Sequence, residues 1–435
     1  MNFTQAHTFL LSLQNMRPPH EHAISETSTE RFSRLGRFLS LCDNPHIRIP
    51  SYIHVTGTSG KGSTATMLAA IYQAHGKKTG LLTSPHISHI TERWQINNRP
   101  MTKKNFTAIV EILIPIYDTF LTNDERNWIT YHELLTMIGF IYFAQEQVDV
   151  AVLEVGMGGD LDATNIIPDK SAAIITTVGA DHLDLLGPTL DDVARHKAGI
   201  ITVPTTIVSG VTDPTHRVII EETAHRVSSH VIYPEYEQCS VTYRTLTTTT
   251  FTYQNHTYKL NTFGAHQIRN ALLAITAAHK LTIPVTAIQR GLARARFPLR
   301  FETMSHNPLC IIDGAHNPEK ITATITAAKE YLELVKTSTG MTPRLYLVIG
   351  FSRGKDYEDA LQSLSSLHPA HIACTRFTDN PFRAALSPNI IASTIKKILP
   401  TTSTSIHIRS HDALSSVYQQ ASPNDCILIT GSIFL

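Results

Sequence analysis

Short apolar runs alternate with amphipathic stretches through the first half of the chain. The apolar runs are typical of strands in a parallel sheet, where both faces are covered, and they fall at 52–55, 79–83, 148–153, 171–178 and 205–209. Apolar residues spaced three and four apart predict helices at 2–15, 27–42, 64–74, 102–121, 131–147 and 189–197. This alternation predicts an α/β domain with a mainly parallel sheet.

The pattern changes in the second half. Residues 229–261 are rich in Thr and Tyr and alternate in polarity, which predicts a small antiparallel patch. Helices are expected at 264–281 and 284–294. A second α/β series predicts a smaller Rossmann-like domain, with strands at 309–312, 345–349, 370–374, 405–409 and 426–430. We therefore expect a first domain, a linker and a second domain, at 1–296, 297–303 and 304–435.

The composition is that of an ordinary globular protein, with 42% hydrophobic and 17% charged residues among 435. A net charge of +1 argues neither for nor against nucleic acid, but the 37 basic residues are spread out, so we expect no nucleic-acid partner. Five scattered cysteines without a Cys-x-x-Cys pair indicate neither a zinc cage nor a disulfide framework. Since we find no leader peptide and no long apolar run, we expect a cytoplasmic protein without a membrane partner.

A glycine-rich turn between an apolar strand and a helix carries the strongest chemical signal. The turn consists of Gly57, Thr58, Ser59, Gly60, Lys61, Gly62 and Ser63. Glycines let backbone N–H groups approach phosphate oxygens, the helix N-terminus adds positive potential, and Lys61 supplies a charge. We therefore expect the turn to bind a nucleotide phosphate. A turn without a ligand is the weaker alternative, because a lysine between two glycines is a poor choice for packing alone.

The turn departs from the general phosphate-loop pattern in two places. Only Thr58 and Ser59 separate Gly57 from Gly60, whereas the general pattern is longer there. Gly62 stands where the hydroxyl that binds magnesium is expected. A metal ligand must therefore come from elsewhere in the chain.

Polar residues also follow three other strands of the first domain. They are Ser84 in Ser84-Pro-His86, Glu154 before a second glycine turn, and His182 in Asp181-His182. The carboxyl ends of parallel strands meet in one crevice, so we expect these side chains to converge on the phosphate turn. A carboxylate and a hydroxyl beside phosphates suit magnesium. On local grounds His182 could instead cap the following turn.

Two further signals are ambiguous on local grounds. Lys197 ends an expected helix, where a surface lysine would interact with the helix dipole. Asp313 and His316 lie in a polar turn after a strand of the second domain. They could grip ribose and phosphate or position an amine, but the turn could equally be an Asx turn with a capping role.

Several motifs occur in order along the chain, and together they resemble one family. They are Gly57-Thr-Ser-Gly-Lys-Gly-Ser63, Thr83-Ser-Pro-His86, Leu153-Glu-Val-Gly-Met-Gly-Gly159, Asp162-Ala-Thr-Asn165, Asp181-His182, Lys197-Ala-Gly-Ile200, Gln267 with Asn270, and Asp313-Gly-Ala-His-Asn-Pro318. This ordered set resembles folylpolyglutamate synthase, or the bifunctional dihydrofolate synthase/folylpolyglutamate synthase, of the Mur ligase superfamily. Each motif alone is weak, but the set is specific and covers nearly the whole chain.

The resemblance implies a fold and a reaction. The fold would be a P-loop central domain of the Mur ligase type, followed by a Rossmann-like C-terminal domain. ATP would phosphorylate a carboxylate of a folate or pteroate, and the amine of L-glutamate would attack the acyl phosphate. The expected cofactors are ATP and Mg2+, and the expected partners are small-molecule substrates of a monomeric enzyme.

The resemblance also implies roles for individual residues. The residues matching Ser84 and Glu154 would hold one magnesium ion, and the residue matching His182 would belong to a second metal site. Lys197 would be carbamylated, which turns a cation into an anionic metal ligand. Lys61, His182 and Lys197 are the candidate catalytic residues.

Nucleotide contacts would come from both domains. The matching residues are Asn270, Arg300, Asp313 and His316. Two positions depart from the family pattern. Ser59 stands where many members have Asn, with little expected effect, and Leu299 replaces a usual Gly, which makes the placement of Arg300 less certain.

Three rival functions are weighed against this ligase. A Mur-type amide ligase acting on a cell-wall precursor would need an N-terminal domain for the UDP moiety, and only about 50 residues precede the turn here. A non-catalytic nucleotide-binding regulator is disfavoured by the presence of both Glu154 and Lys197. A kinase is the weakest, although two domains and a metal-rich crevice also suit phosphoryl transfer. The choice between dihydropteroate and tetrahydrofolate stays open.

Overall fold

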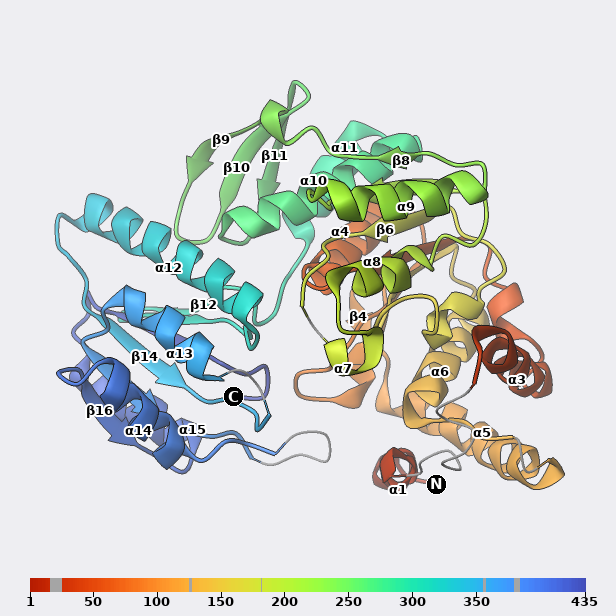
Figure 1. Cartoon of the computed structure of the whole chain (residues 1–435), viewed down its shortest axis with the longest axis horizontal. Helices are drawn as coiled ribbons and strands as arrows, with labels where there is room; N and C mark the ends of the chain where they lie inside the picture. The colour runs from red at the N-terminus through yellow and green to blue at the C-terminus, as the bar shows by residue number, and fades with distance from the viewer. Residues whose placement is uncertain (16–25, 125–126, 181, 355–356, 379–383) are drawn as a thin grey trace. The chain divides into compact units, whose positions relative to one another are not determined.

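The structure is a computed structural model that describes the chain except residues 16–25, 125–126, 181, 355–356 and 379–383 (Figure 1). Asp181 of the Asp181-His182 motif therefore lies outside the described residues. The chain forms two compact units. The first contains residues 1–236 and 269–294, and the second contains 237–268 and 295–435. The antiparallel patch thus groups with the C-terminal residues, and the domain boundaries expected from the sequence stay a prediction.

An eight-stranded sheet, in the order β4-β3-β2-β5-β1-β6-β7-β8, forms the centre of the first unit. Its strands are β1 (Tyr52–Thr56), β2 (Thr79–Leu82), β3 (Trp94–Ile96), β4 (Arg99–Pro100), β5 (Val150–Glu154), β6 (Ala172–Ile175), β7 (Thr206–Ser209) and β8 (Val231–Ile232). All neighbours pair in parallel except β3 and β4, which are antiparallel. Every residue of β1 and β5 is buried, as expected of the middle of a covered parallel sheet.

Most helices of this unit follow the amphipathic stretches of the sequence, but those at 183–186 and 214–226 were not expected from it. The helices are α1 (Phe3–Ser12), α3 (Ser28–Leu41), α4 (Lys61–Ala74), α5 (Lys103–Asn123), α6 (Tyr131–Gln145), α7 (Leu183–Leu186), α8 (Leu190–Ala198), α9 (Pro214–Arg226), α10 (Ala265–Lys280) and α11 (Val285–Arg294). The helix at 265–280 begins in the second unit. Helix α4 starts directly from the glycine turn, and α11 packs on it so closely that a Cβ at Gly291 would lie 2.4 Å from Ile71 Cα. The phosphate turn is thereby fixed between strand β1 and a buried helix.

Short 3-10 turns complete the first unit. They are η1 (Leu13–Asn15), η2 (Pro45–Ile47), η3 (Ile90–Arg93), η4 (Ala163–Ile166) and η5 (Tyr236–Gln238). Among the described helices, α5 alone is long and apolar enough to cross a membrane, which is weak evidence by itself. Its buried residues Phe106, Ile109, Leu113 and Tyr117 are spaced as on one face of an amphipathic helix. That spacing is the pattern of a helix packed on a protein core.

The second unit has two sheets. The small one is antiparallel, in the order β11-β10-β9, with β9 (Cys239–Arg244), β10 (Thr249–Tyr253) and β11 (His256–Leu260). The larger one has the order β12-β13-β17-β14-β15-β16, with β12 (Glu302–His306), β13 (Leu309–Ile312), β14 (Leu345–Ile349), β15 (His371–Cys374), β16 (Ser403–Ile406) and β17 (Cys426–Thr430). Only its edge strand β12 is antiparallel. Both the antiparallel patch and the second parallel series are therefore confirmed.

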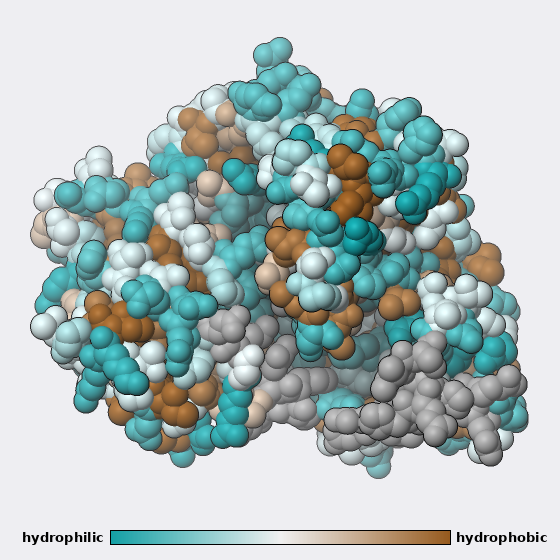
Figure 2. Space-filling view, viewed as in Figure 1, coloured by the Kyte–Doolittle hydropathy of each residue, from teal (hydrophilic) through white to brown (hydrophobic). Residues whose placement is uncertain are grey.

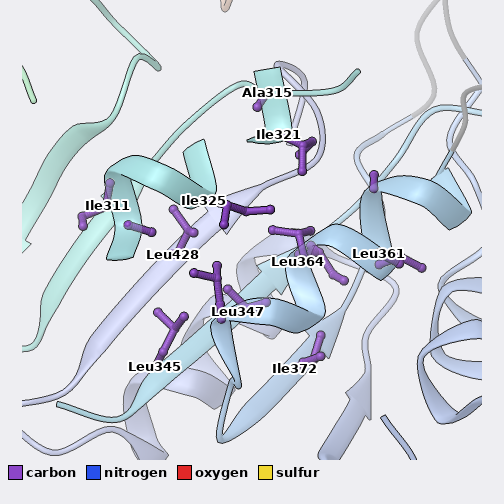
Figure 3. Packing of buried hydrophobic residues seen from close by; sticks show 14 of the residues in the cluster. Ile311, Ala315, Ile321, Ile325, Leu345, Leu347, Leu361, Leu364, Ile372 and Leu428 are labelled. Atoms are coloured by element: carbon purple, nitrogen blue, oxygen red, sulfur yellow. The ribbon is translucent and has the colours of Figure 1, made fainter. Parts of the chain in front are cut away.

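Aliphatic side chains fill the core of the larger sheet of the second unit. The helices of this unit are α12 (Pro318–Thr339), α13 (Tyr357–Leu364), α14 (Pro388–Ile398) and α15 (Ser410–Gln420), with the 3-10 turn η6 (Ser365–Leu367). Leu347 of β14 and Leu428 of β17 pack with Ile325 of α12 and Leu364 of α13 (Figure 3). On the face of the molecule in Figure 2, apolar residues are scattered among polar ones.

Candidate active site

Two glycines of the phosphate turn have backbone conformations that exclude a side chain. Gly57 has φ +147°, and a Cβ there would overlap the hydroxyl of Thr176. Gly60 has φ +83°, and a Cβ there would lie 2.3 Å from Oδ1 of Asn270. Gly60 is also the residue from which α4 begins. Asn270, expected as a nucleotide contact, therefore lies directly against the turn.

Two threonines that follow strand β6, Thr176 and Thr177, form hydrogen bonds with the turn. Thr58 N donates to Thr177 O at 3.0 Å, and Ser59 N donates to Thr177 Oγ1 at 2.9 Å. Thr176 Oγ1 donates to Ser59 O at 2.5 Å. Ser59 takes part in two of these three bonds, both times through its backbone, which agrees with the expectation that its side chain matters little.

Lys61 lies over the turn itself. Its Nζ donates to Gly57 O at 2.7 Å and to Thr58 O at 3.4 Å. Both acceptors are neutral backbone carbonyls, so these bonds leave the lysine charge uncompensated. The positive charge of Lys61 and the start of α4 thus occupy the same concave turn, as a phosphate site requires.

Glu154 lies beside Gly62, where the general phosphate-loop pattern has the hydroxyl that binds magnesium. A Cβ at Gly62 would lie 3.3 Å from both carboxylate oxygens of Glu154, and Ser84 N donates to Oε2 of Glu154 at 2.8 Å. Glu154 is buried at the end of β5, which pairs with β1 at Val55. The two residues expected to hold one magnesium ion are thus adjacent. A buried carboxylate beside the phosphate turn is a donor set that fits Mg2+.

One pocket brings the three candidate catalytic residues together. Its lining residues are Gly57, Thr58, Lys61, Gly156, Met157, Gly158, His182, Leu186 and Lys197. Lys197 is only 3% exposed, so it is not a surface lysine at a helix end. His182 has a left-handed backbone, φ +56°, just before α7, and its side chain makes no capping bond there.

The glycine loop after β5 is locked against the end of α8, the helix that carries Lys197. A Cβ at Gly159 would lie 2.5 Å from His196 O, so only glycine permits this approach. Asp160 N donates to His196 O at 3.0 Å, and Oδ1 of Asp160 lies 2.7 Å from Nδ1 of His196. Thr56 Oγ1 donates to Gly158 O at 2.5 Å from the other side. The loop therefore sets the distance between β5 and Lys197.

A buried lysine, Lys170, links the Asp162-Ala-Thr-Asn165 motif to the residues that follow Lys197. Lys170 Nζ donates to Asn165 Oδ1 at 3.1 Å, to Ile200 O at 2.6 Å and to Thr202 Oγ1 at 3.2 Å. Asn165 Nδ2 donates to Gly199 O at 3.0 Å. Burial lowers the pKa of Lys170 to about 7. This clamp joins the Asp162-Ala-Thr-Asn165 motif to the backbone that follows Lys197.

Arg93 is a buried charge near the site that the spacing of the sequence does not single out. Its Nε donates to Nδ1 of His86 at 3.0 Å. Burial and the charge of Arg93 lower the pKa of His86 to about 4, so this imidazole is neutral. Burial lowers the pKa of Arg93, and the Glu154 carboxylate opposes that shift. Arg93, at the end of η3, thus places a positive charge beside the Ser84-Pro-His86 loop and near Glu154.

The remaining predicted nucleotide contacts lie in the second unit, at the carboxyl end of β13. Asp313 is buried, and its oxygens accept Phe301 N, Ala315 N and Thr324 Oγ1, each at 2.8–2.9 Å. Nδ1 of His316 lies 2.8 Å from Gly314 O. Asp313 therefore organises the turn, as the Asx-turn alternative expects. Its contact with a nucleotide stays a prediction, as does that of His316.

Arg300 lies in a strained stretch beside this turn. Its Nη1 donates to Leu299 O at 3.1 Å. Leu299 and Phe301 both have left-handed backbones, with φ +55° and φ +51°. The position where the family pattern has glycine is thus one whose conformation favours glycine. A nucleotide contact of Arg300 also stays a prediction.

No group of three or more His, Cys, Asp and Glu side chains in the described ranges is arranged to hold a metal ion. The expected ligand set is of another kind, because it includes a serine and a modified lysine. Metal binding by Ser84, Glu154, His182 and Lys197 remains a prediction from the sequence.

Comparison with known families accounts for nearly all of the chain after residue 54. Residues 55–278 match the family profile described as Mur ligase middle domain. Residues 299–433 match the profile described as Mur ligase, glutamate ligase domain. Both profiles agree with the two α/β series described above.

Individual relatives agree with these profiles. The folylpolyglutamate synthase of Lacticaseibacillus casei is 33% identical over 76% of this chain and 77% of its own length. A probable bifunctional folylpolyglutamate synthase/dihydropteroate synthase of Haloferax volcanii is 30% identical over the whole chain. The chain spans about half the length of that relative and of its Halobacterium salinarum counterpart. The solved structure of E. coli FolC in complex with DHPP and ADP has a TM-score of 0.80 and 26% identity, over 99% of this chain and 95% of that one.

Proposed function

The chain belongs to the folylpolyglutamate synthase family of the Mur ligases, and we propose that it is an ATP-dependent ligase that joins L-glutamate to a folate. The observation that carries this proposal is the pocket in which Lys61, His182 and Lys197 meet the glycine turn. The ADP bound in the E. coli relative supports a nucleotide in the same fold.

The first half of the reaction activates a carboxylate. An oxygen of the folate carboxylate attacks the γ-phosphorus of ATP, the bond from that phosphorus to ADP breaks, and an acyl phosphate forms. Lys61 and the N–H groups of the turn hold the phosphate oxygens and favour the charge that develops there. Ser84 and Glu154 would hold Mg2+, which when bound neutralises phosphate charge.

The second half forms the amide. The neutral glutamate amine attacks the acyl carbon, the bond from carbon to the phosphate oxygen breaks, and the proton that the nitrogen loses passes to the departing phosphate. Water would hydrolyse the acyl phosphate, so the reacting groups must be shielded from solvent. His182 and Lys197 line the pocket at this step, with Lys197 as a carbamate that adds anionic oxygens for metal binding. Asn270, Arg300, Asp313 and His316 would contact the nucleotide.

The proposed partners are ATP, glutamate and a folate or dihydropteroate, and the proposed enzyme is a cytoplasmic monomer. A kinase or a regulator would not form an amide, and a cell-wall ligase would not use a folate. Identifying the reaction product therefore distinguishes the proposed folate ligase from these three alternatives.

An ADP-release assay with product mass analysis tests the proposal. Magnesium, ATP and glutamate are supplied with tetrahydrofolate, with dihydropteroate, or with neither. We expect ADP release that needs a folate-type substrate, and a product heavier by one glutamyl residue. Lys61→Ala is the loss-of-function variant for this assay, because removal of the turn's charge should lower turnover by about 100-fold or more. ADP release without an amide product, or release unaffected by Lys61→Ala, would contradict the proposal.

A further inference from the structure

A hydrogen-bond chain that is buried at its β1 end and exposed at its loop end connects strand β1 to the loop that follows β5. His54 on β1 is fully buried, and its Nε2 lies 2.8 Å from Oγ1 of Thr164. That hydroxyl donates to Oδ1 of Asp162 at 2.5 Å, and Thr164 N donates to the same oxygen at 3.0 Å. The other carboxylate oxygen accepts the N–H groups of Gly156 and Met157, at 3.0 and 3.2 Å. The chain therefore ends on the backbone of a loop that lines the pocket.

The direction of the protons follows from the donors available. The Thr164 hydroxyl has one hydrogen, which it donates in the hydrogen bond to the carboxylate. Its oxygen must therefore accept the hydrogen bond from the N–H at His54 Nε2. Nδ1 of His54 is then bare, and it has no partner among the residues that the structure describes. Burial, with a smaller contribution from the charge of Lys170, holds the pKa of His54 well below its ordinary value. His54 is thus a neutral, fixed donor.

We propose that His54 and Thr164 are positioning residues of the active site, which hold the loop at Gly156–Gly158 through the carboxylate of Asp162. The loop begins two residues after Glu154 and shares the pocket with Lys61 and Lys197. A Cβ at Gly156 would lie 3.1 Å from Oδ2 of Asp162, so a side chain there would crowd the carboxylate. Only the effect on turnover rests on the proposed function.

Loss of the Thr164 hydroxyl should release this loop. Asp162 would lose one of its four donors, and the buried N–H of His54 would be left without an acceptor. The weakened carboxylate would hold the N–H groups of Gly156 and Met157 less firmly. A loop that opens more often places the pocket's groups less accurately, and accurate placement is worth large factors in rate.

Thr164→Val and Thr164→Ser form the test pair, since the first removes the hydroxyl at nearly constant size and the second retains it. Thr276→Val is the matched control, because Thr276 is a buried threonine of α10 whose hydroxyl has no partner in the described part of the chain. Amide hydrogen exchange of residues 156–157 is measured in each variant, together with kcat and KM for ATP-dependent ADP release.

In Thr164→Val we expect exchange at 156–157 to be faster by about tenfold or more and kcat to fall by about tenfold or more. The KM for ATP should change little, because the phosphate turn is unaltered. Thr164→Ser should restore both quantities, and Thr276→Val should match the wild type. If Thr164→Val does not fold, His54→Leu takes its place, with His54→Gln as the variant that restores an N–H donor.

Unchanged exchange in Thr164→Val would overturn the inference, and so would faster exchange with unchanged kcat. If the wild type releases no ADP with any folate, the proposed function fails. The positioning role is then tested by amide hydrogen exchange at residues 156–157 alone. Faster exchange that Thr164→Ser reverses would then support the positioning role, and unchanged exchange would refute it.

Discussion

At the scale of single residues, Gly62 and Glu154 explain how the turn can lack a hydroxyl after its lysine. A side chain at Gly62 would point at the carboxylate of Glu154, 3.3 Å from both oxygens. The carboxylate that we propose as the magnesium ligand thus comes from the end of a neighbouring strand rather than from the helix that follows the turn. The pairing of β1 with β5 fixes this geometry.

Glu154→Ala should lose activity through metal binding. The carboxylate is a normal magnesium ligand, and its removal takes away one of the proposed ligands of the ion. We expect turnover to fall by about 100-fold at a magnesium level that saturates the wild type, and to recover partly as magnesium is raised. Glu146→Ala is the control, because Glu146 is a half-exposed carboxylate that pairs with Lys78. A magnesium titration identical to that of the wild type would make Glu154 structural.

Lys197→Ala tests the proposed carbamate. An unmodified cation would repel magnesium, whereas a neutral lysine amine that attacks carbon dioxide loses a proton and becomes an anionic carbamate. Lys197→Ala should lower kcat by about 100-fold, and added short carboxylates should restore part of the rate by filling the vacated space. Lys77→Ala, at an exposed lysine, should be inert. Full activity in Lys197→Ala would remove the lysine from the mechanism.

His54 should make the fold sensitive to acid. Its pKa is well below the ordinary 6.5 in the folded chain, so only the unfolded chain binds its proton as the pH falls below 6.5. Stability contributed by the neutral ring is present above pH 6.5 and is lost below it, by up to about 1.4 kcal/mol per pH unit. Urea midpoints at pH 7.5 and 5.5 should therefore differ more in the wild type than in His54→Gln. Equal differences would show that His54 titrates normally in the fold.

At the scale of elements, the stretch before β12 contains two left-handed residues, Leu299 and Phe301, that are neither Gly, Asn nor Asp. Leu299 has φ +55°, although a leucine there costs about 1–2 kcal/mol. The backbone is held because Leu299 O accepts Gly314 N at 2.9 Å and Leu299 N donates to Glu302 at 2.9 Å. The expected family glycine would remove this strain.

Leu299→Gly should therefore be more stable than Leu299→Ala. Both variants lose the same half-buried side chain beyond Cβ, but only glycine relieves the left-handed backbone. We expect a difference of roughly 1 kcal/mol in the free energy of unfolding of this unit, measured by chemical denaturation. Equal stabilities, or a more stable Leu299→Ala, would mean that the strain is absent in solution.

The elements were predictable to different degrees. The continuous apolar run of β5 and the alternating polarity of the Thr-rich antiparallel sheet are local patterns, so both could be predicted from the sequence. Strands β3 and β4 have only three and two residues, too short for a period, and they escape prediction. The phosphate turn is local and was predictable. The contact between His54 and Thr164 was not, because the two residues are 110 positions apart and the Asp162-Ala-Thr-Asn165 motif does not show what Thr164 binds.

At the scale of the whole molecule, the chain has two α/β units, and its residues 55–278 and 299–433 match two Mur ligase profiles. The order of motifs along the chain was enough to indicate the family, and the folds of both units agree with it. The first unit gathers Lys61, His182 and Lys197 in one pocket, which local patterns alone leave open for His182 and Lys197. The burial of Lys197 and the proximity of Glu154 to Gly62 result from packing between distant segments. The spacing of residues in the sequence could therefore not predict them.

Transfer of a labelled oxygen tests the central claim most directly. A folate accepted in the assay is labelled with 18O in the reacting carboxylate and incubated with the chain, magnesium, ATP and glutamate. The carboxylate oxygen that attacks phosphorus leaves with the phosphate when the amine attacks carbon. We therefore expect the released phosphate to carry one 18O atom and the amide product to retain the other. Unlabelled phosphate, or phosphate release without an amide, would contradict an acyl-phosphate ligase.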